Sequence, residues 1–205
     1  MCFSAGASFA SSGVLGGAGI VTVLKTKRIR ALALTPILFA IQQFIEGLQW
    51  LSTNPSQLSI ILGYGFLLFA FLLWPIYVPS AVMHIEKDKT RRRALRFFQV
   101  LGVLIAVYLF SAMATQPLSV AVFPRGLEYQ IYIPFENIIV YLYIACVCGS
   151  LFESSRLILR IMALLLLISA IISLVIFQAT FTSTWCFFAA ILSLSLIVGM
   201  KWIEK

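Results

Sequence analysis

Long apolar runs alternate with short polar connections along the whole chain. Each run approaches the roughly 20 residues that a helix needs to cross the hydrocarbon core of a bilayer. The runs are too long and too continuous for barrel strands, which alternate over about 10 residues. The pattern predicts an all-α, seven-transmembrane helix bundle in a single domain, 1–205, with an outer loop at 116–136. The expected helices are about 5–24, 31–52, 58–84, 97–115, 137–152, 157–177 and 183–203.

Composition supports a membrane location. The chain is 61% hydrophobic and only 11% charged, whereas a soluble domain carries about a quarter charged residues. Its mean hydropathy is +1.03. The net charge of +8 could suggest a nucleic-acid partner, but the basic residues fall in the gaps between apolar runs. We therefore expect an integral membrane protein whose partner is the lipid bilayer, and no nucleic acid.

The distribution of basic residues predicts an orientation. With seven crossings, fourteen of the fifteen lysines and arginines fall on one side of the membrane, and only Arg125 falls on the other. Positive charge marks the cytoplasmic side. We therefore expect the N-terminus outside and the C-terminus in the cytoplasm.

A polar stripe interrupts the second run, in the sequence IQQFIEGLQW. Helical spacing places its polar residues on one face. A carboxylate at the centre of a membrane helix costs about 2.5–3.5 kcal/mol on insertion scales. The stripe is either a hydrogen-bonded structural cluster or one wall of a polar pocket open to the outside, and we expect the pocket. The stripe consists of Gln42, Gln43, Glu46, Gln49 and Trp50.

Two other helices offer candidate parts. Pro75 and Pro79 predict a bend in the third helix, because proline lacks the backbone N–H and frees a carbonyl one turn back. Trp74 and Tyr77 flank this bend and could line a pocket or face lipid. The first helix carries small residues at four-residue steps, from Ser4 to Gly16, which predicts close packing against a neighbour.

The outer loop predicts a β-hairpin. The segments SVAVF and LEYQIYI flank Pro124–Arg125–Gly126, and short alternating runs around such residues are typical of hairpins. The hairpin is either a lid over the outer mouth of the bundle or a simple connector.

The four cysteines divide into two pairs. Cys146 and Cys148 are expected to be small core residues. Cys2 and Cys186 both fall on the outer side, and three roles stay open for them. They could form a disulfide. They could bind a zinc or copper ion together with Glu46. Alternatively, Cys2 could be a redox-active or nucleophilic thiol, with Glu46 as the second catalytic residue.

Four stretches, MCFSAGASF, IQQFIEGLQW, LWPIYVP and STWCFFAAILS, together resemble a family of bacterial multipass membrane proteins of unknown function that begin MCFSA. The resemblance spans the whole chain and implies a bacterial cytoplasmic (inner) membrane, but no chemistry. It points to the residues that carry the family motifs, namely Cys2, Gln43, Glu46, Trp50, Pro75, Pro79, Trp185 and Cys186.

We expect the outer pocket to bind a metal ion, a cofactor or a small molecule. The alternatives are a small-molecule or proton-coupled transporter or sensor, and an intramembrane enzyme acting on lipid or quinone, so enzymatic activity stays open. The single histidine, His84, argues against membrane hydrolases that bind zinc through several histidines. A homo-oligomer is possible. The expected ligand-binding residues are Gln42, Gln43, Gln49, Trp50, Trp74, Tyr77 and Trp185.

Overall fold

The structure, a computed structural model, describes residues 4–26, 29–52, 56–123 and 126–203. Most of these residues are helical, and the rest form a two-stranded hairpin and short connections. In chain order the elements are α1 (Ala5–Lys25), α2 (Arg30–Ala33), α3 (Thr35–Leu51), α4 (Gln57–Leu67), the π-helix η1 (Leu68–Leu73), α5 (Trp74–Ile85), α6 (Lys89–Thr115), β1 (Ser119–Phe123), β2 (Gly126–Gln130), α7 (Glu136–Phe152), α8 (Leu157–Ile176), the 3₁₀-helix η2 (Gln178–Thr180) and α9 (Phe181–Ile203).

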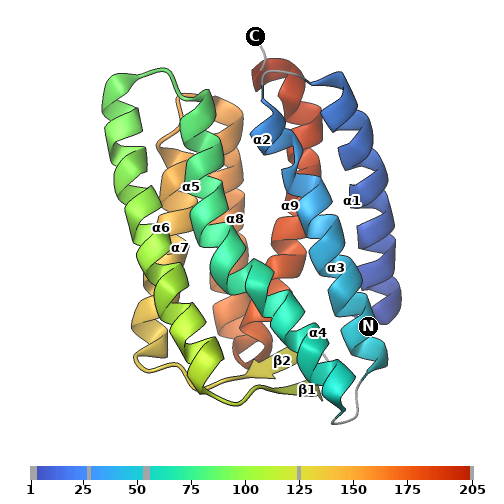
Figure 1. Cartoon of the computed structure of the whole chain (residues 1–205). Helices are drawn as coiled ribbons and strands as arrows, with labels where there is room; N and C mark the ends of the chain where they lie inside the picture. Colours follow the sequence, from blue (N-terminus) through green and yellow to red (C-terminus); the bar gives the residue numbers. More distant parts are fainter. Residues whose placement is uncertain (1–3, 27–28, 53–55, 124–125, 204–205) are drawn as a thin grey trace.

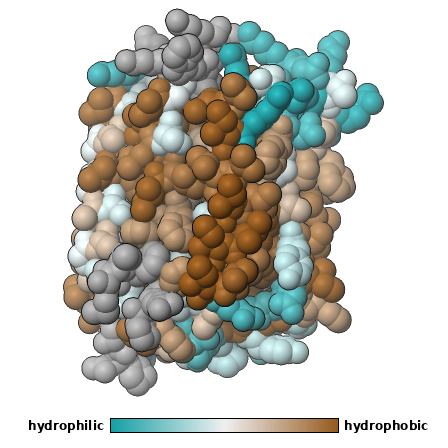
Figure 2. All heavy atoms as spheres, turned by 180° about the vertical axis from the view of Figure 1, so that it is seen from behind, coloured by the Kyte–Doolittle hydropathy of each residue, from teal (hydrophilic) through white to brown (hydrophobic). Residues whose placement is uncertain are grey.

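The helices lie side by side and run between two ends of an elongated bundle (Figure 1). We call these the hairpin end, where β1 and β2 lie, and the basic end, where α9 terminates and where the α5–α6 and α7–α8 connections lie. Among the described residues, six helical stretches are long and apolar enough to cross a membrane, and α7 is a shorter apolar helix of 17 residues. Figure 2 shows a broad apolar band between two more polar ends. The chain is therefore a membrane protein.

Two helix boundaries differ from those expected. The fourth predicted helix begins at Lys89 rather than near 97, because the basic run KTRRRALR continues the helix. Asp88 caps this start, and its Oδ1 accepts a hydrogen bond from the Arg91 amide at 2.8 Å. The second predicted helix is divided at Leu34, just before Pro36.

The small-residue face of α1 packs closely on α3, as its spacing predicts. The Ser12 hydroxyl donates to the Ala40 carbonyl at 2.8 Å, and a Cβ on Gly16 would lie 3.6 Å from the Ala40 methyl group. Gly47 of α3 leaves room for the Phe9 ring, which a Cβ would approach to 2.7 Å. These contacts fix α3, and with it the polar stripe, against the first helix.

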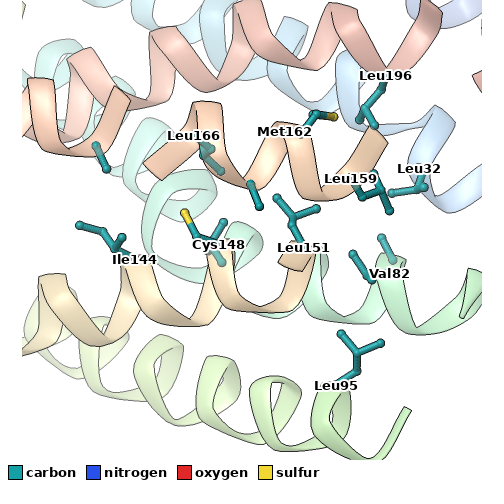
Figure 3. Close-up of a cluster of buried hydrophobic side chains, with 14 of the residues drawn as sticks. Leu32, Val82, Leu95, Ile144, Cys148, Leu151, Leu159, Met162, Leu166 and Leu196 are labelled. Atoms are coloured by element: carbon teal, nitrogen blue, oxygen red, sulfur yellow. The ribbon is translucent and has the colours of Figure 1, made fainter. Parts of the chain in front are cut away.

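An apolar core fills the basic half of the bundle. Figure 3 shows side chains from α2, α5, α6, α7, α8 and α9 meeting there. Cys148 lies among them, between α7 and α8. Cys146 lies in a second cluster nearer the hairpin end. Both cysteines are buried and free, which confirms that they are small core residues.

Pro75 follows the π-helix η1 at the middle of the third long helical stretch. The Trp74 amide bonds back five residues, to the Phe69 carbonyl. The next amide on this pattern would bond the Ala70 carbonyl, but Pro75 has no N–H. The Tyr143 hydroxyl of α7 donates to that carbonyl instead. The carbonyl freed by Pro75 is thus used inside the protein to hold α7.

Pro79 frees a second carbonyl, that of Pro75, one turn earlier. This oxygen faces α6 at Gly102 and lies 3.8 Å from the Cys146 sulfur. A Cβ on Gly102 would overlap the Pro75 carbonyl. The glycine therefore permits α5 and α6 to approach at the bend.

We predict that Gly102→Ala destabilises the protein by about 1–3 kcal/mol, because the added methyl meets rigid backbone and the two helices must move apart. The thermal unfolding midpoint in detergent, followed by circular dichroism, measures this. Gly13→Ala is the matched control: nothing lies within 4 Å of a Cβ at Gly13, so its midpoint should be unchanged or slightly higher. Equal midpoints for the two variants would contradict this account of the bend.

Candidate functional site

Glu46 is the centre of a polar cluster inside the hairpin end of the bundle. It lies on α3 with only 2% of its surface exposed. Gln43, one turn earlier, donates from Nε2 to Oε2 of Glu46 at 2.9 Å. The Ser183 hydroxyl, at the start of α9, donates to the other carboxylate oxygen. Both oxygens of this buried acid are therefore hydrogen-bonded, as burial of a polar group requires.

The neighbouring glutamines connect α3 to two further helices. Gln42 accepts a hydrogen bond from the Trp74 indole N–H of α5 at 2.8 Å, and Gln49 donates to the Ser59 hydroxyl of α4 at 2.7 Å. The Trp74 ring also stacks on Phe39, with centroids 3.9 Å apart. The polar face of α3 thus holds α4, α5 and α9 around it.

The hairpin covers this cluster. β1 and β2 pair antiparallel, with Val122 opposite Leu127. The Leu127 amide lies 3.5 Å from the Ser183 oxygen, so Ser183 connects the hairpin to Glu46. Tyr129 stacks on Phe66 of α4 with centroids 4.6 Å apart. Burial raises the pKa of Tyr129 well above its usual value, and the nearby Glu46 carboxylate raises it further. The phenol therefore keeps its proton.

Several polar atoms in this region have no hydrogen-bond partner. They are buried, and they are Gln42 Nε2, Gln43 Oε1, Gln49 Oε1 and the Tyr129 hydroxyl. The Gln42 amide also faces the Cys186 thiol. The cluster consequently has donors and acceptors beyond those that join its own members.

A cavity of about 680 Å³ lies beside the cluster at the hairpin end, between β2, α7, α8 and α9. Seven of its 23 lining residues are aromatic, and its polar groups include Glu128, Glu136 and Asn137. Neither Glu46 nor the three glutamines line it. Tyr129 and Cys186 do line it, and both lie within electrostatic reach of Glu46. These two side chains therefore stand between the cavity and the buried acid.

A narrower apolar slot of about 80 Å³ continues from the cavity toward the basic end. Tyr143, Trp185 and Cys186 line both spaces. The Trp185 indole donates to the Leu166 carbonyl at 3.2 Å, and its ring packs edge-on against Tyr143 at 5.7 Å. These three side chains form the wall between the cavity and the slot.

Comparison with known proteins gives a family but no chemistry. A family model described as a family of unknown function (DUF6629) matches residues 1–204. The chain belongs to the DUF6629 family. No curated protein and no solved structure matches it. The resemblance inferred from the sequence motifs, to a family of unknown function, is thus confirmed for the whole chain.

In this DUF6629 protein the polar stripe faces inward, but it does not form an open pocket. The three glutamines and Glu46 are buried in a closed cluster, and Trp50 at the end of α3 is half-buried. The open cavity is separated from this cluster by the side chains of Tyr129 and Cys186. The expectation that Glu46 itself lines an open pocket is therefore corrected, because the hairpin and α9 close over it.

Two of the aromatic candidates lie in the interior of the bundle. Trp74 and Trp185 are buried. The Tyr77 hydroxyl donates to the Ala31 carbonyl, and its ring lines the slot. Trp74 also lines the slot, while Trp185 borders both spaces. Trp74 lies inside the bundle, whereas Tyr77 is half-buried and also lines a groove on the outer surface of α5.

The metal and disulfide hypotheses receive no support. Within the described ranges, no three His, Cys, Asp or Glu side chains are grouped to hold a metal ion such as zinc or copper. Cys186 is buried beside Glu46 and carries a free thiol. Cys2, the expected partner of Cys186 and candidate catalytic thiol, lies outside the described residues.

Two contributors to the site were missed in the sequence. Ser183 stands in TSTW, one turn before Cys186, and its position near the start of the last helix matches the depth of Glu46. Tyr129 lies two residues after Leu127 on β2, and the two-residue period of a strand places both side chains on the same face. These two signals could have identified the residues, although not their partner in α3.

We predict that Ser183→Ala loosens the hairpin. The substitution leaves one carboxylate oxygen of Glu46 without its donor, at a cost of about 1–3 kcal/mol, and removes the contact with the Leu127 amide. Hydrogen exchange at Leu127 should become faster, and the unfolding midpoint should fall. Ser195→Ala is the control on the same helix, because that hydroxyl donates only to the Leu192 carbonyl one turn back. Unchanged exchange at Leu127 in Ser183→Ala would refute the connection.

Proposed function

We propose that the chain is a seven-span protein of a bacterial cytoplasmic membrane, with its N-terminus outside. In this proposal α7 also crosses, since its 17 residues lie at the short limit for a membrane helix. The hairpin end then faces out and the basic end faces the cytoplasm, which agrees with the positive-inside rule. The motif resemblance to bacterial multipass proteins supports the location.

Cysteine labelling tests this orientation. In a Cys2→Ser background the other three cysteines are buried. Tyr132→Cys at the hairpin end and Lys89→Cys at the basic end add exposed thiols. We predict that a membrane-impermeant maleimide applied to intact cells labels Tyr132→Cys, and that it labels Lys89→Cys only after the cells are permeabilised. The reverse pattern would rule out the orientation.

We further propose that the protein binds a small amphipathic organic cation in the outer cavity. The observation that carries this is the combination of size and lining. A volume of about 680 Å³ lies within the range of small-molecule sites, roughly 300–1,000 Å³. Aromatic faces attract cations through their quadrupoles. The wall includes Tyr129, Tyr143, Phe181 and Trp185.

The charge of the lining favours a cation over an anion. Glu128 and Glu136 contribute carboxylates at the rim, and no lysine or arginine is among the described lining residues. Glu46 lies beneath the cavity and adds a third acidic group, behind Tyr129 and Cys186. The role we propose for Glu46 is to anchor this floor by holding Ser183 and the hairpin in place. The ligand itself contacts the aromatic and rim residues.

Two lipophilic ions of nearly equal size and opposite charge test the proposal. We predict saturable binding of tetraphenylphosphonium to the purified protein, measured by equilibrium dialysis in detergent, and much weaker binding of tetraphenylborate. Glu128→Gln together with Glu136→Gln should weaken cation binding roughly tenfold, since partly exposed ion pairs contribute about 0.2–1 kcal/mol each.

Glu153→Gln provides the control, because Glu153 lies at the basic end, between α7 and α8. Its affinity for the cation should equal that of the unmodified protein. Equal binding of the two ions, or an unchanged affinity in the double variant, would eliminate a cation site in this cavity.

A further inference from the structure

A second pocket, of about 460 Å³, lies at the basic end of the bundle. It is remote from the outer cavity and shares no lining residue with it. Four lining residues are basic, and they come from three segments: the α5–α6 connection, the first turn of α6 and the start of α8. These four are Lys87, Lys89, Arg92 and Arg156, and the rest of the lining is Ile29, His84, Ile85 and Glu86.

The one acid in the lining is already used by the backbone. Glu86 Oε1 accepts hydrogen bonds from the amides of Lys87 at 2.9 Å and Asp88 at 3.1 Å, and Oε2 accepts from the Ser155 amide at 2.6 Å. Its residue surface is only 3% exposed. Burial alone would raise the pKa of Glu86, but these amide hydrogen bonds lower it below its ordinary value. The carboxylate thus joins the end of α5 to the start of α8.

The next acid along the chain is also engaged by the backbone, because Asp88 caps α6 through the Arg91 amide. These two carboxylates thus bind backbone amides, and the pocket lining, with four Lys or Arg side chains and one Glu, keeps a net positive charge. His84 is exposed, and its Nδ1 lies 2.7 Å from the Ser80 carbonyl oxygen. The pocket carries four cationic groups against one carboxylate that is turned inward.

Arg92 is held in a fixed place on the pocket wall. One nitrogen, Nη1, donates to the carbonyls of Met83 at 3.0 Å and Glu86 at 3.1 Å, which satisfies the C-terminal end of α5. A guanidinium carries donors on all three of its nitrogens, in a planar fork that matches phosphate oxygens. Two of these nitrogens remain to meet a ligand. Lys89 and Arg156 have no such capping role through their side chains.

The pocket also has an apolar part, formed by Ile29 and Ile85, and Ile85 is the last residue of the apolar stretch Gln57–Ile85, which is long enough to cross a membrane. A phospholipid has an anionic phosphate next to apolar acyl chains. Basic side chains next to an apolar surface at the end of a membrane-spanning stretch are complementary to that arrangement. We propose that this pocket binds the phosphodiester headgroup of an anionic phospholipid. The inference does not depend on the ligand of the outer cavity.

Native mass spectrometry of the purified protein tests the proposal. The protein is exchanged into nanodiscs that hold phosphatidylcholine and phosphatidylglycerol in equal amounts, and the lipids that stay bound on release are counted. We expect selective retention of phosphatidylglycerol. The double substitution Lys89→Gln with Arg156→Gln should weaken the retention of phosphatidylglycerol roughly 30-fold, because each basic residue near an anionic lipid raises the affinity about fivefold.

Arg93→Gln with Arg96→Gln is the matched control. It removes the same charge from exposed positions on α6 outside the pocket. Its retention of phosphatidylglycerol should stay within about twofold of that of the unmodified protein. Lys89→Arg with Arg156→Lys keeps the charge and should keep the lipid, which separates loss of binding from failure to fold.

Three results would overturn the proposal. Equal losses in the two glutamine variants would mean that diffuse surface charge attracts the lipid. Equal retention of the two lipids by the unmodified protein would remove the site. Displacement of phosphatidylglycerol by millimolar inorganic phosphate would identify a site for free anions instead of a headgroup site.

Discussion

The hydrogen bonds around Glu46 determine how the hairpin half of this protein is assembled. A carboxyl group inside an apolar bundle is costly unless it is paired, and its partners here come from different parts of the chain. Gln43 belongs to the same helix, whereas Ser183 brings in the last helix and, through the Leu127 amide, the hairpin. One acid therefore joins α3, α9 and β2, and it sets the floor of the outer cavity.

The bend at Pro75 and Pro79 follows a related rule. In an apolar environment a freed carbonyl must find other partners, and in this protein neighbouring helices approach both freed carbonyls. Tyr143 donates to the Ala70 carbonyl, while the Pro75 carbonyl packs against α6 at Gly102, with the Cys146 thiol, shared with the Phe98 carbonyl, 3.8 Å away. The bend thus fixes α6 and α7 in place. It also brings Tyr143 to the boundary of the cavity.

Much of the architecture follows from residue spacing. The apolar runs locate the long helices, and the three- and four-residue spacing of the glutamines and Glu46 places them on a buried face. The alternation around residues 119–130 indicates the hairpin. Spacing within one helix cannot identify a partner on another, so Ser183 and Tyr129 could not be assigned to Glu46. The π-helix was also not predictable, because LFAFLL is apolar on every side and has no period that distinguishes five-residue from four-residue bonding.

The closed state of the site is the other feature that the sequence could not supply. An inward polar stripe is equally compatible with an open pocket and with a sealed cluster, and the position of the hairpin over α9 decides between them. The same closure separates the acid from the cavity by two side chains, Tyr129 and Cys186. The residues that line the cavity are therefore different from the glutamines and Glu46, which hold the helices together.

The wall between cavity and slot is made of side chains only. Two of its rings are each tethered by one hydrogen bond to a main-chain oxygen, Tyr143 to Ala70 and Trp185 to Leu166. Turning such a ring aside leaves a buried carbonyl without its donor, at a cost of about 1–3 kcal/mol per bond, and also gives up the packing between Trp185, Tyr143 and Phe181. The passage between the outer and inner halves of this bundle is therefore closed by the same two hydrogen bonds that tie α7 and α9 to their neighbours, and opening it loosens those ties.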